Sequence, residues 1–162
     1  MKYIIESERL GLRKFRPSDA ERLYNNHLEE EVKRWIPGES YADLEETVGA
    51  IDFYVARVES ERLPYVLAVE LKESGELIGD TGVNYVKNRS DQVEIGYTIC
   101  KKHSGKGCAT ELLGLMTEFM FEKFGIKSIY GRVMNGNDAS VRVLEKNGYT
   151  FLNKETDADD DP

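Results

Sequence analysis

The spacing of apolar residues predicts two helices near the start of the chain. After Pro17, Ser18 and Glu21 have the S-x-x-E form of a capping box, which predicts a short helix over 19–28. Further on, apolar residues recur every three or four positions, which predicts a helix over about 42–59 with one buried face. These residues are Leu44, Val48, Ile51, Val55 and Val58.

The pattern changes between Pro64 and Cys100, where β-branched and aromatic residues dominate and polar turn residues interrupt them. Such segments are typical of strands, and their short connections indicate antiparallel hairpins. The predicted strands are 65–71, 77–86 and 92–100.

A helical period returns after Gly105-Lys106-Gly107, and Gly125 ends it. A further strand is predicted over 127–134. Strand, glycine turn, helix and strand form one βαβ crossover, so strands 92–100 and 127–134 should be parallel. The apolar face of the helix carries Leu112, Leu115, Met116, Phe119 and Met120.

The last part of the chain predicts one more helix and a short strand. Asn137 or Asp138 caps a helix that runs through Lys146 and stops at a following glycine. Residues 149–152 are expected to form the last strand. The segment 155–162 has five acidic residues and no basic one, so we expect a folded domain over 1–154 and a disordered acidic tail.

Composition narrows the class of protein. The 162 residues are 40% hydrophobic, which suits one domain with a real core. The 22 basic and 30 acidic residues give a net charge of -8, which argues against non-specific nucleic-acid binding and suits a cationic substrate. Neither a signal peptide nor an apolar run long enough for a bilayer occurs, and two cysteines cannot make a disulfide framework. We therefore expect a cytoplasmic protein that acts at no membrane.

The glycine turn is the first candidate site. Small residues and the exposed N–H groups of a helix start favour an anion such as a pyrophosphate, although a plain tight turn explains the same residues. The run matches neither the P-loop nor the dinucleotide-binding pattern, which disfavours a nucleotide kinase or a Rossmann dehydrogenase. No His, Cys, Asp or Glu spacing indicates a metal site.

Several segments together resemble the GNAT superfamily of acyl-CoA-dependent N-acetyltransferases. The carriers of the resemblance are Glu94-Ile95-Gly96-Tyr97, Gly105 through Glu111, Asn137-Asp138-Ala139-Ser140 and Leu144 through Tyr149. The opening Glu8 through Arg13 and Pro17 through Ala20 resemble the ribosomal-protein alanine/serine N-acetyltransferase (RimJ/RimL-like) branch. The resemblance covers about residues 6–152. It implies an α+β GNAT fold, whose mixed, mostly antiparallel central sheet has a splayed parallel pair and is flanked by helices.

The resemblance also implies where acetyl-CoA binds. The pantetheine arm would lie between strands 92–100 and 127–134, beside the backbone of Tyr97, Thr98 and Ile99. The diphosphate would meet a loop for which the family has the pattern Q/R-x-x-G-x-G/A, and Ser104 departs from its first position. The loop residues are Ser104, Gly105, Lys106, Gly107, Cys108, Ala109 and Thr110.

Two residues are candidates for the chemistry. Glu94 lies where several family members carry a base, although a solvent-facing strand carboxylate is an equal interpretation. Ser140 follows Asn137 in an N-x-x-S spacing that contacts CoA in the similar branch, and its hydroxyl could aid departure of the thiolate. The alternative is an ordinary helix start capped by Asn137. The tyrosine acid of many GNAT enzymes is replaced by Leu144, and direct transfer is favoured over an acyl intermediate on Cys108.

The acceptor side is less defined. Trp35, expected in a loop between the first two helices, serves either as a core anchor or as a substrate wall. Asn84 and Tyr85 are candidates to line the acceptor groove. The family has one more strand after the last segment, so an exposed edge would favour a homodimer. We expect acetyl transfer to a primary amine, first of all a protein N-terminus; the alternatives are a small amine such as a polyamine or amino sugar, and a non-catalytic acyl-CoA-binding module.

Overall fold

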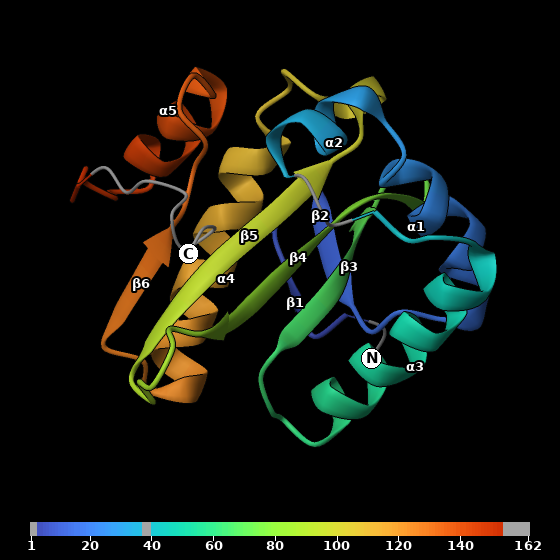
Figure 1. The fold of residues 1–162 in the computed structure, drawn as a ribbon, viewed down its shortest axis with the longest axis horizontal. Helices are drawn as coiled ribbons and strands as arrows, with labels where there is room; N and C mark the ends of the chain where they lie inside the picture. Colours follow the sequence, from blue (N-terminus) through green and yellow to red (C-terminus); the bar gives the residue numbers. More distant parts are fainter. Residues whose placement is uncertain (1–2, 37–39, 154–162) are drawn as a thin grey trace.

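The centre of the molecule is one six-stranded sheet with the strand order β1-β2-β3-β4-β5-β6 (Figure 1). The computed structural model describes residues 3–36 and 40–153. Neighbouring strands are antiparallel from β1 to β5, and β5 and β6 are parallel. The predicted α+β fold is therefore confirmed. The strands are β1 (Ile5–Glu6), β2 (Leu10–Arg13), β3 (Tyr65–Leu71), β4 (Glu76–Tyr85), β5 (Gln92–Ile99) and β6 (Ser128–Gly131).

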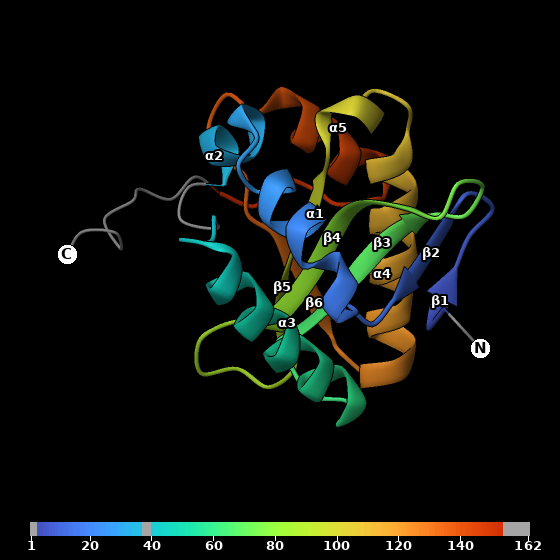
Figure 2. The same cartoon turned by 90° about the vertical axis from the view of Figure 1, so that its right-hand side faces the viewer.

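Helices cover both faces of the sheet. Figure 2 shows α1 and α3 on one side, called the front face below, and α4 on the other. None of the described helices is both long and apolar enough to cross a bilayer. The helices are α1 (Ala20–Asn26), α2 (Glu30–Trp35), α3 (Leu44–Glu59), α4 (Cys108–Phe124) and α5 (Asp138–Lys146), with 3-10 turns η1 (Pro17–Asp19) and η2 (Lys101–His103).

Two apolar cores hold these layers together. The larger core joins α4 to the back of the sheet, and Leu112, Met116 and Met120 are fully buried in it, as their helical spacing predicts. The smaller core joins α1 and α3 to the front face through Leu23, Ile51 and their neighbours. The crossover from β5 through α4 to β6 therefore fixes the parallel pair from behind.

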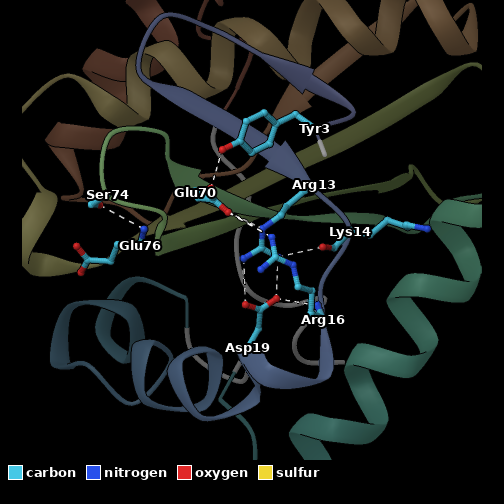
Figure 3. Close-up of polar contacts among 8 residues, drawn as sticks. All are labelled: Tyr3, Arg13, Lys14, Arg16, Asp19, Glu70, Ser74 and Glu76. Atoms are coloured by element: carbon cyan, nitrogen blue, oxygen red, sulfur yellow. Dashed lines mark hydrogen bonds and ion pairs between the residues drawn. The ribbon is translucent and has the colours of Figure 1, made fainter. Parts of the chain in front are cut away.

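A buried ionic cluster ties the N-terminal strands to the first helix (Figure 3). The Arg13 guanidinium donates to both carboxylate oxygens of Asp19, at 2.8 and 3.0 Å, and to Glu70 at 2.8 Å. Tyr3 donates its hydroxyl to Glu70 at 2.6 Å. Burial alone would lower the pKa of Arg13, but the bonds to Asp19 and Glu70 raise it above the ordinary value. The cluster keeps Arg13 charged inside the protein.

This cluster also explains why the predicted capping box is wrong. The chain forms the turn η1 first, and α1 begins only at Ala20 with no side-chain cap. Asp19, not Ser18, organises the start, because its carboxylate accepts from Arg13 and from the Arg16 N–H at 2.7 Å. The ion pair between Asp19 and the buried Arg13, six residues earlier, has overridden the local capping pattern.

Three further expectations need correction. The start of the chain forms a hairpin of two strands, β1 and β2, and an extra helix, α2, precedes α3. Trp35 is the last residue of α2 and not part of a loop. Residues 149–152 form no strand: Tyr149 packs on the core, while Phe151 and Leu152 are 80% and 70% exposed. The proposed tail, 155–162, lies outside the described residues.

Candidate active site

The parallel strands separate halfway along β5. Their register runs from Gln92 opposite Ser128 to Ile95 opposite Gly131, where β6 ends, while β5 continues to Ile99. Along 96–99, no other described strand pairs with this edge of β5. The predicted contact residues Tyr97, Thr98 and Ile99 all lie in this unpaired stretch. Their backbone can therefore hydrogen-bond an extended ligand as a missing strand would.

Helix α5 packs on the end of β6 and on α4. Leu144 packs over Gly131 so closely that a Cβ on this glycine would lie 2.6 Å from Leu144 Cδ2. Asn147 at the end of α5 donates to the Thr110 carbonyl of α4 at 3.1 Å. The residue that replaces the family's tyrosine acid thus has a packing role, and α5 is fixed with its first turn beside the gap.

The predicted anion loop forms the start of α4. Gly105 and Gly107 have φ values of 75° and 82°, a conformation that glycine adopts without strain. Ser104 uses its hydroxyl locally, donating to the Lys101 carbonyl at 2.8 Å. The first backbone bond of α4 runs from Glu111 to Gly107, so within the described structure the N–H groups of 108–110 have no backbone partner. Such amides suit a diphosphate. Cys108 is buried and free.

Ser140 and Asn137 meet a tyrosine at the mouth of the gap. Tyr97 Oη donates to Ser140 Oγ at 3.2 Å, and Asn137 Nδ2 donates to the same oxygen at 3.2 Å. Asn137 Oδ1 accepts from the Ser140 N–H, which caps α5. Burial raises the pKa of Tyr97, so the phenol stays protonated at neutral pH and can donate this bond. The structure therefore shows Asn137 as the cap of α5, and its contact with CoA stays a prediction.

Glu94 lies at the edge of the gap. Its carboxylate accepts from Arg132 Nη2 at 2.9 Å, and its side chain is 39% exposed. Asn84 is its register partner on β4, so both side chains share the front face, whereas alternation places Tyr85 on the opposite face. The structure brings Glu94 and Asn84 together and separates Tyr85 from them.

Trp35 reaches the same region from α2. Its ring lies 3.8 Å from the position that a Cβ on Gly136 would take, just before Asn137. Arg34 stacks on the ring, with its guanidinium carbon 4.5 Å from the ring centroid. The half-buried ring therefore lies between α2 and the loop that leads to α5.

Sequence comparison decides the family. The chain matches the family model described as an acetyltransferase (GNAT) domain over residues 9–150. The chain belongs to the GNAT family. The Bacillus subtilis protein named Uncharacterized N-acetyltransferase YoaA is 30% identical over 146 residues, which cover 90% of this chain and 82% of the relative.

Solved structures agree with the fold. RimL, a ribosomal L7/L12 alpha-N-protein acetyltransferase in complex with coenzyme A, has a TM-score of 0.80 at 18% identity, with 94% of this chain and 86% of RimL covered. A ribosomal-protein-S5-alanine acetyltransferase from Vibrio fischeri has a TM-score of 0.78 at 20% identity, with 90% and 82% covered. The predictions of a GNAT enzyme and of acetyl-CoA as its cosubstrate are confirmed. This GNAT protein is an acetyl-CoA-dependent N-acetyltransferase.

A polar cluster on the front face of the GNAT sheet has no counterpart among the residues predicted from the sequence. Asp80 Oδ2 lies 2.7 Å from His27 Nε2 and accepts from the Thr98 hydroxyl at 3.0 Å. His27 and Thr98 are buried. The available signal was Asp80 itself, a charge within an apolar strand. The cluster fixes the end of α1 against the unpaired part of β5.

A second missed cluster lies just before the anion loop. Glu76 accepts from Arg22 at 2.9 Å and lies 3.1 Å from the buried His103. The pKa of Glu76 is lowered from 4.5 to about 2. The bond from Arg22 is the largest cause, and the bond from His103 lowers the pKa further. The cluster anchors η2, from which the loop departs. The described residues contain no group of His, Cys, Asp and Glu side chains suited to a metal ion.

Proposed function

We propose that this GNAT enzyme acetylates the α-amino group of a protein or peptide N-terminus by direct transfer. Bound acetyl-CoA supplies the activated acetyl thioester. The net charge of -8 supports a cationic acceptor. The ribosomal-protein acetyltransferases among the structural neighbours support a protein N-terminus. A small amine is the other acceptor class.

The observation that carries the chemistry is the hydrogen bonding of Ser140. A serine hydroxyl has two acceptor lone pairs and one proton to donate. Tyr97 and Asn137 both donate to Ser140 Oγ, so both lone pairs are used. The remaining O–H must point elsewhere, and no described side chain accepts it. We infer that Ser140 donates to the sulfur as the carbon–sulfur bond breaks, which stabilises the developing thiolate.

Glu94 is the proposed base. The attacking amine must lose a proton, and a carboxylate at the edge of the gap can take it directly or through one water. Arg132 holds the carboxylate at the edge of the parallel pair. Asn84, on the same face, and Trp35, against the loop before Asn137, are the proposed acceptor-side residues. Tyr85 would contact only a larger acceptor, because its side chain lies on the opposite face.

The remaining proposed roles concern the cofactor. The backbone of Tyr97, Thr98 and Ile99 would pair with the pantetheine arm, and the amides of the loop from Ser104 to Thr110 would hold the diphosphate. Support comes from the unpaired edge of β5 and the unbonded amides. Lys106, exposed in the loop, adds a positive charge there.

The test is thiol release from acetyl-CoA with a panel of amines across a pH series. Peptides beginning with Ser or Ala stand beside polyamines and amino sugars. We expect release with the peptides, and rates that rise as the acceptor amine loses its proton. Release with small amines alone would keep the enzyme and reject the protein acceptor.

Two further proposals concern context. We infer a cytoplasmic enzyme, supported by two free, buried cysteines, which suit a reducing compartment. We also propose a homodimer that pairs through the edge of β6. The support is that β6 has a described strand on one side only. Sedimentation of the purified chain distinguishes a monomer from a dimer.

A further inference from the structure

The anion loop carries a carboxylate at an unexpected place. Glu111 lies in the first turn of α4, close in sequence to the amides that would meet a diphosphate. A negative charge there stabilises the helix start but repels an anionic ligand. Unless it is neutralised, Glu111 should weaken the site that the loop forms.

The β1–β2 hairpin neutralises Glu111. Its carboxylate accepts from the Ser7 hydroxyl, from the Arg9 N–H at 3.0 Å and from Arg9 Nε at 2.8 Å. Burial alone would raise the pKa of Glu111, yet these bonds lower it. The backbone of Arg9, between β1 and β2, is itself fixed beside the end of β3, because its carbonyl accepts from the Lys72 N–H at 2.8 Å.

Arg9 also donates a hydrogen bond to the loop. Its Nη1 donates to the Lys106 carbonyl at 2.8 Å. In a trans peptide the C=O and the next N–H point in opposite directions, so this bond turns the Gly107 N–H away from Arg9. Arg9 thus contacts the loop from the side opposite to the Gly107 N–H.

We propose that Arg9 and Glu111 are positioning residues for acetyl-CoA, which hold the backbone of the 105–107 loop in its phosphate-binding conformation. The inference rests on the proposed role of this loop and is independent of Ser140 and of the acceptor. One side chain joins the sheet edge, the loop and the first turn of α4. A loop with two positive-φ glycines has many conformations, and this link selects one.

A competing explanation treats Arg9 as a bare positive charge near the phosphates. The two explanations predict opposite changes in CoA affinity when the Glu111 carboxylate is removed. If charge alone matters, removal of the Glu111 carboxylate should tighten CoA binding. If positioning matters, the same removal should weaken it, because Arg9 loses its anchor.

The experiment measures CoA affinity by calorimetry and steady-state kinetics for Arg9→Ala and Glu111→Ala in the full chain. We expect each variant to weaken CoA binding roughly 10- to 100-fold and to raise KM for acetyl-CoA, with kcat at saturation unchanged. The control is Lys123→Ala, which breaks an ion pair with Glu61 at the other end of α4. We expect its affinity to match the wild type.

Other outcomes would overturn the inference or the site on which it rests. Tighter binding by Glu111→Ala, or wild-type affinity in both variants, overturns the positioning role. Wild-type protein that binds no CoA would instead reject the proposed loop site itself. Should a variant unfold, Arg9→Lys replaces it, since lysine can pair with Glu111 but cannot hold the Lys106 carbonyl as well. A folded Arg9→Lys protein with wild-type CoA affinity would also overturn the inference.

Discussion

The hydroxyl of Tyr97 on β5 donates a hydrogen bond to the hydroxyl of Ser140 on α5, 3.2 Å away across the separated parallel strands. The family's usual tyrosine position holds Leu144, yet a phenol still reaches the site from another element. Its role differs: it occupies a lone pair of Ser140 and so directs the serine proton outward. In the proposed mechanism, Ser140 is then the donor for the leaving sulfur, in place of a tyrosine on α5.

Removal of the Tyr97 hydroxyl should slow the enzyme. In Tyr97→Phe, Ser140 loses one of its two donors, and we expect kcat to fall roughly 2- to 10-fold with KM for acetyl-CoA unchanged. The matched control is Tyr149→Phe, because Tyr149 is another part-buried tyrosine whose hydroxyl lies 2.7 Å from a hydroxyl, that of Thr117. Equal kcat losses in the two variants would indicate a general packing effect and contradict the role of Tyr97.

Glu94→Gln tests the base. The amide keeps the shape but cannot take a proton, so we expect kcat/KM to fall roughly 10²- to 10⁴-fold. Arg132→Gln breaks the same ion pair and keeps the carboxylate, so its activity should stay within a few-fold of wild type. A loss of equal size in both variants would mean that the pair serves structure and not proton transfer.

The buried Arg13 cluster should dominate stability at the N-terminal end. Arg13→Met leaves Asp19 and Glu70 without their buried partner, and we expect the free energy of unfolding to fall by about 3–5 kcal/mol. Lys14→Met breaks an exposed pair with Glu59 and should change it by less than about 1 kcal/mol. Urea unfolding measures both. Similar values for the two variants would contradict the account of the cluster.

Glu76 predicts a pH dependence of stability. Its pKa is lowered from 4.5 to about 2. At pH values above the ordinary pKa, the charged carboxylate therefore stabilises the folded state. We expect Glu76→Gln to lose on the order of 2 kcal/mol at pH 7. The difference from wild type should shrink as the pH falls from about 5 toward 2, because protonation then removes the interaction in the wild type as well. A constant difference over that range would contradict it.

Much of this fold could be predicted from local sequence. The apolar period of α4 and the glycines at both its ends are local signals, and the crossover makes β5 and β6 parallel. The cap of α5 was likewise predictable, because the bond from the Ser140 N–H to the Asn137 side chain spans only three residues.

The rest depended on contacts between distant parts of the chain. Arg9 and Glu111 are 102 positions apart, and His27 and Asp80 are 53 apart, so no spacing rule relates them. The capping prediction at Ser18 failed because Arg13, which the distant Glu70 holds in the interior, pairs with Asp19 instead. The strand predicted over 149–152 does not form, because no described strand edge pairs with it, and apolar periodicity alone cannot predict a pairing partner.

The measurement that tests the central claim most directly follows acetylation of peptides beginning with Ser or Ala by mass spectrometry, for the wild type and for Ser140→Ala. We predict that the wild type adds one acetyl group at the peptide N-terminus. We predict that Ser140→Ala keeps KM for acetyl-CoA within a few-fold of the wild type and transfers the group roughly 10- to 100-fold more slowly. No transfer by the wild type to any amine, or equal rates in the two proteins, would contradict the account.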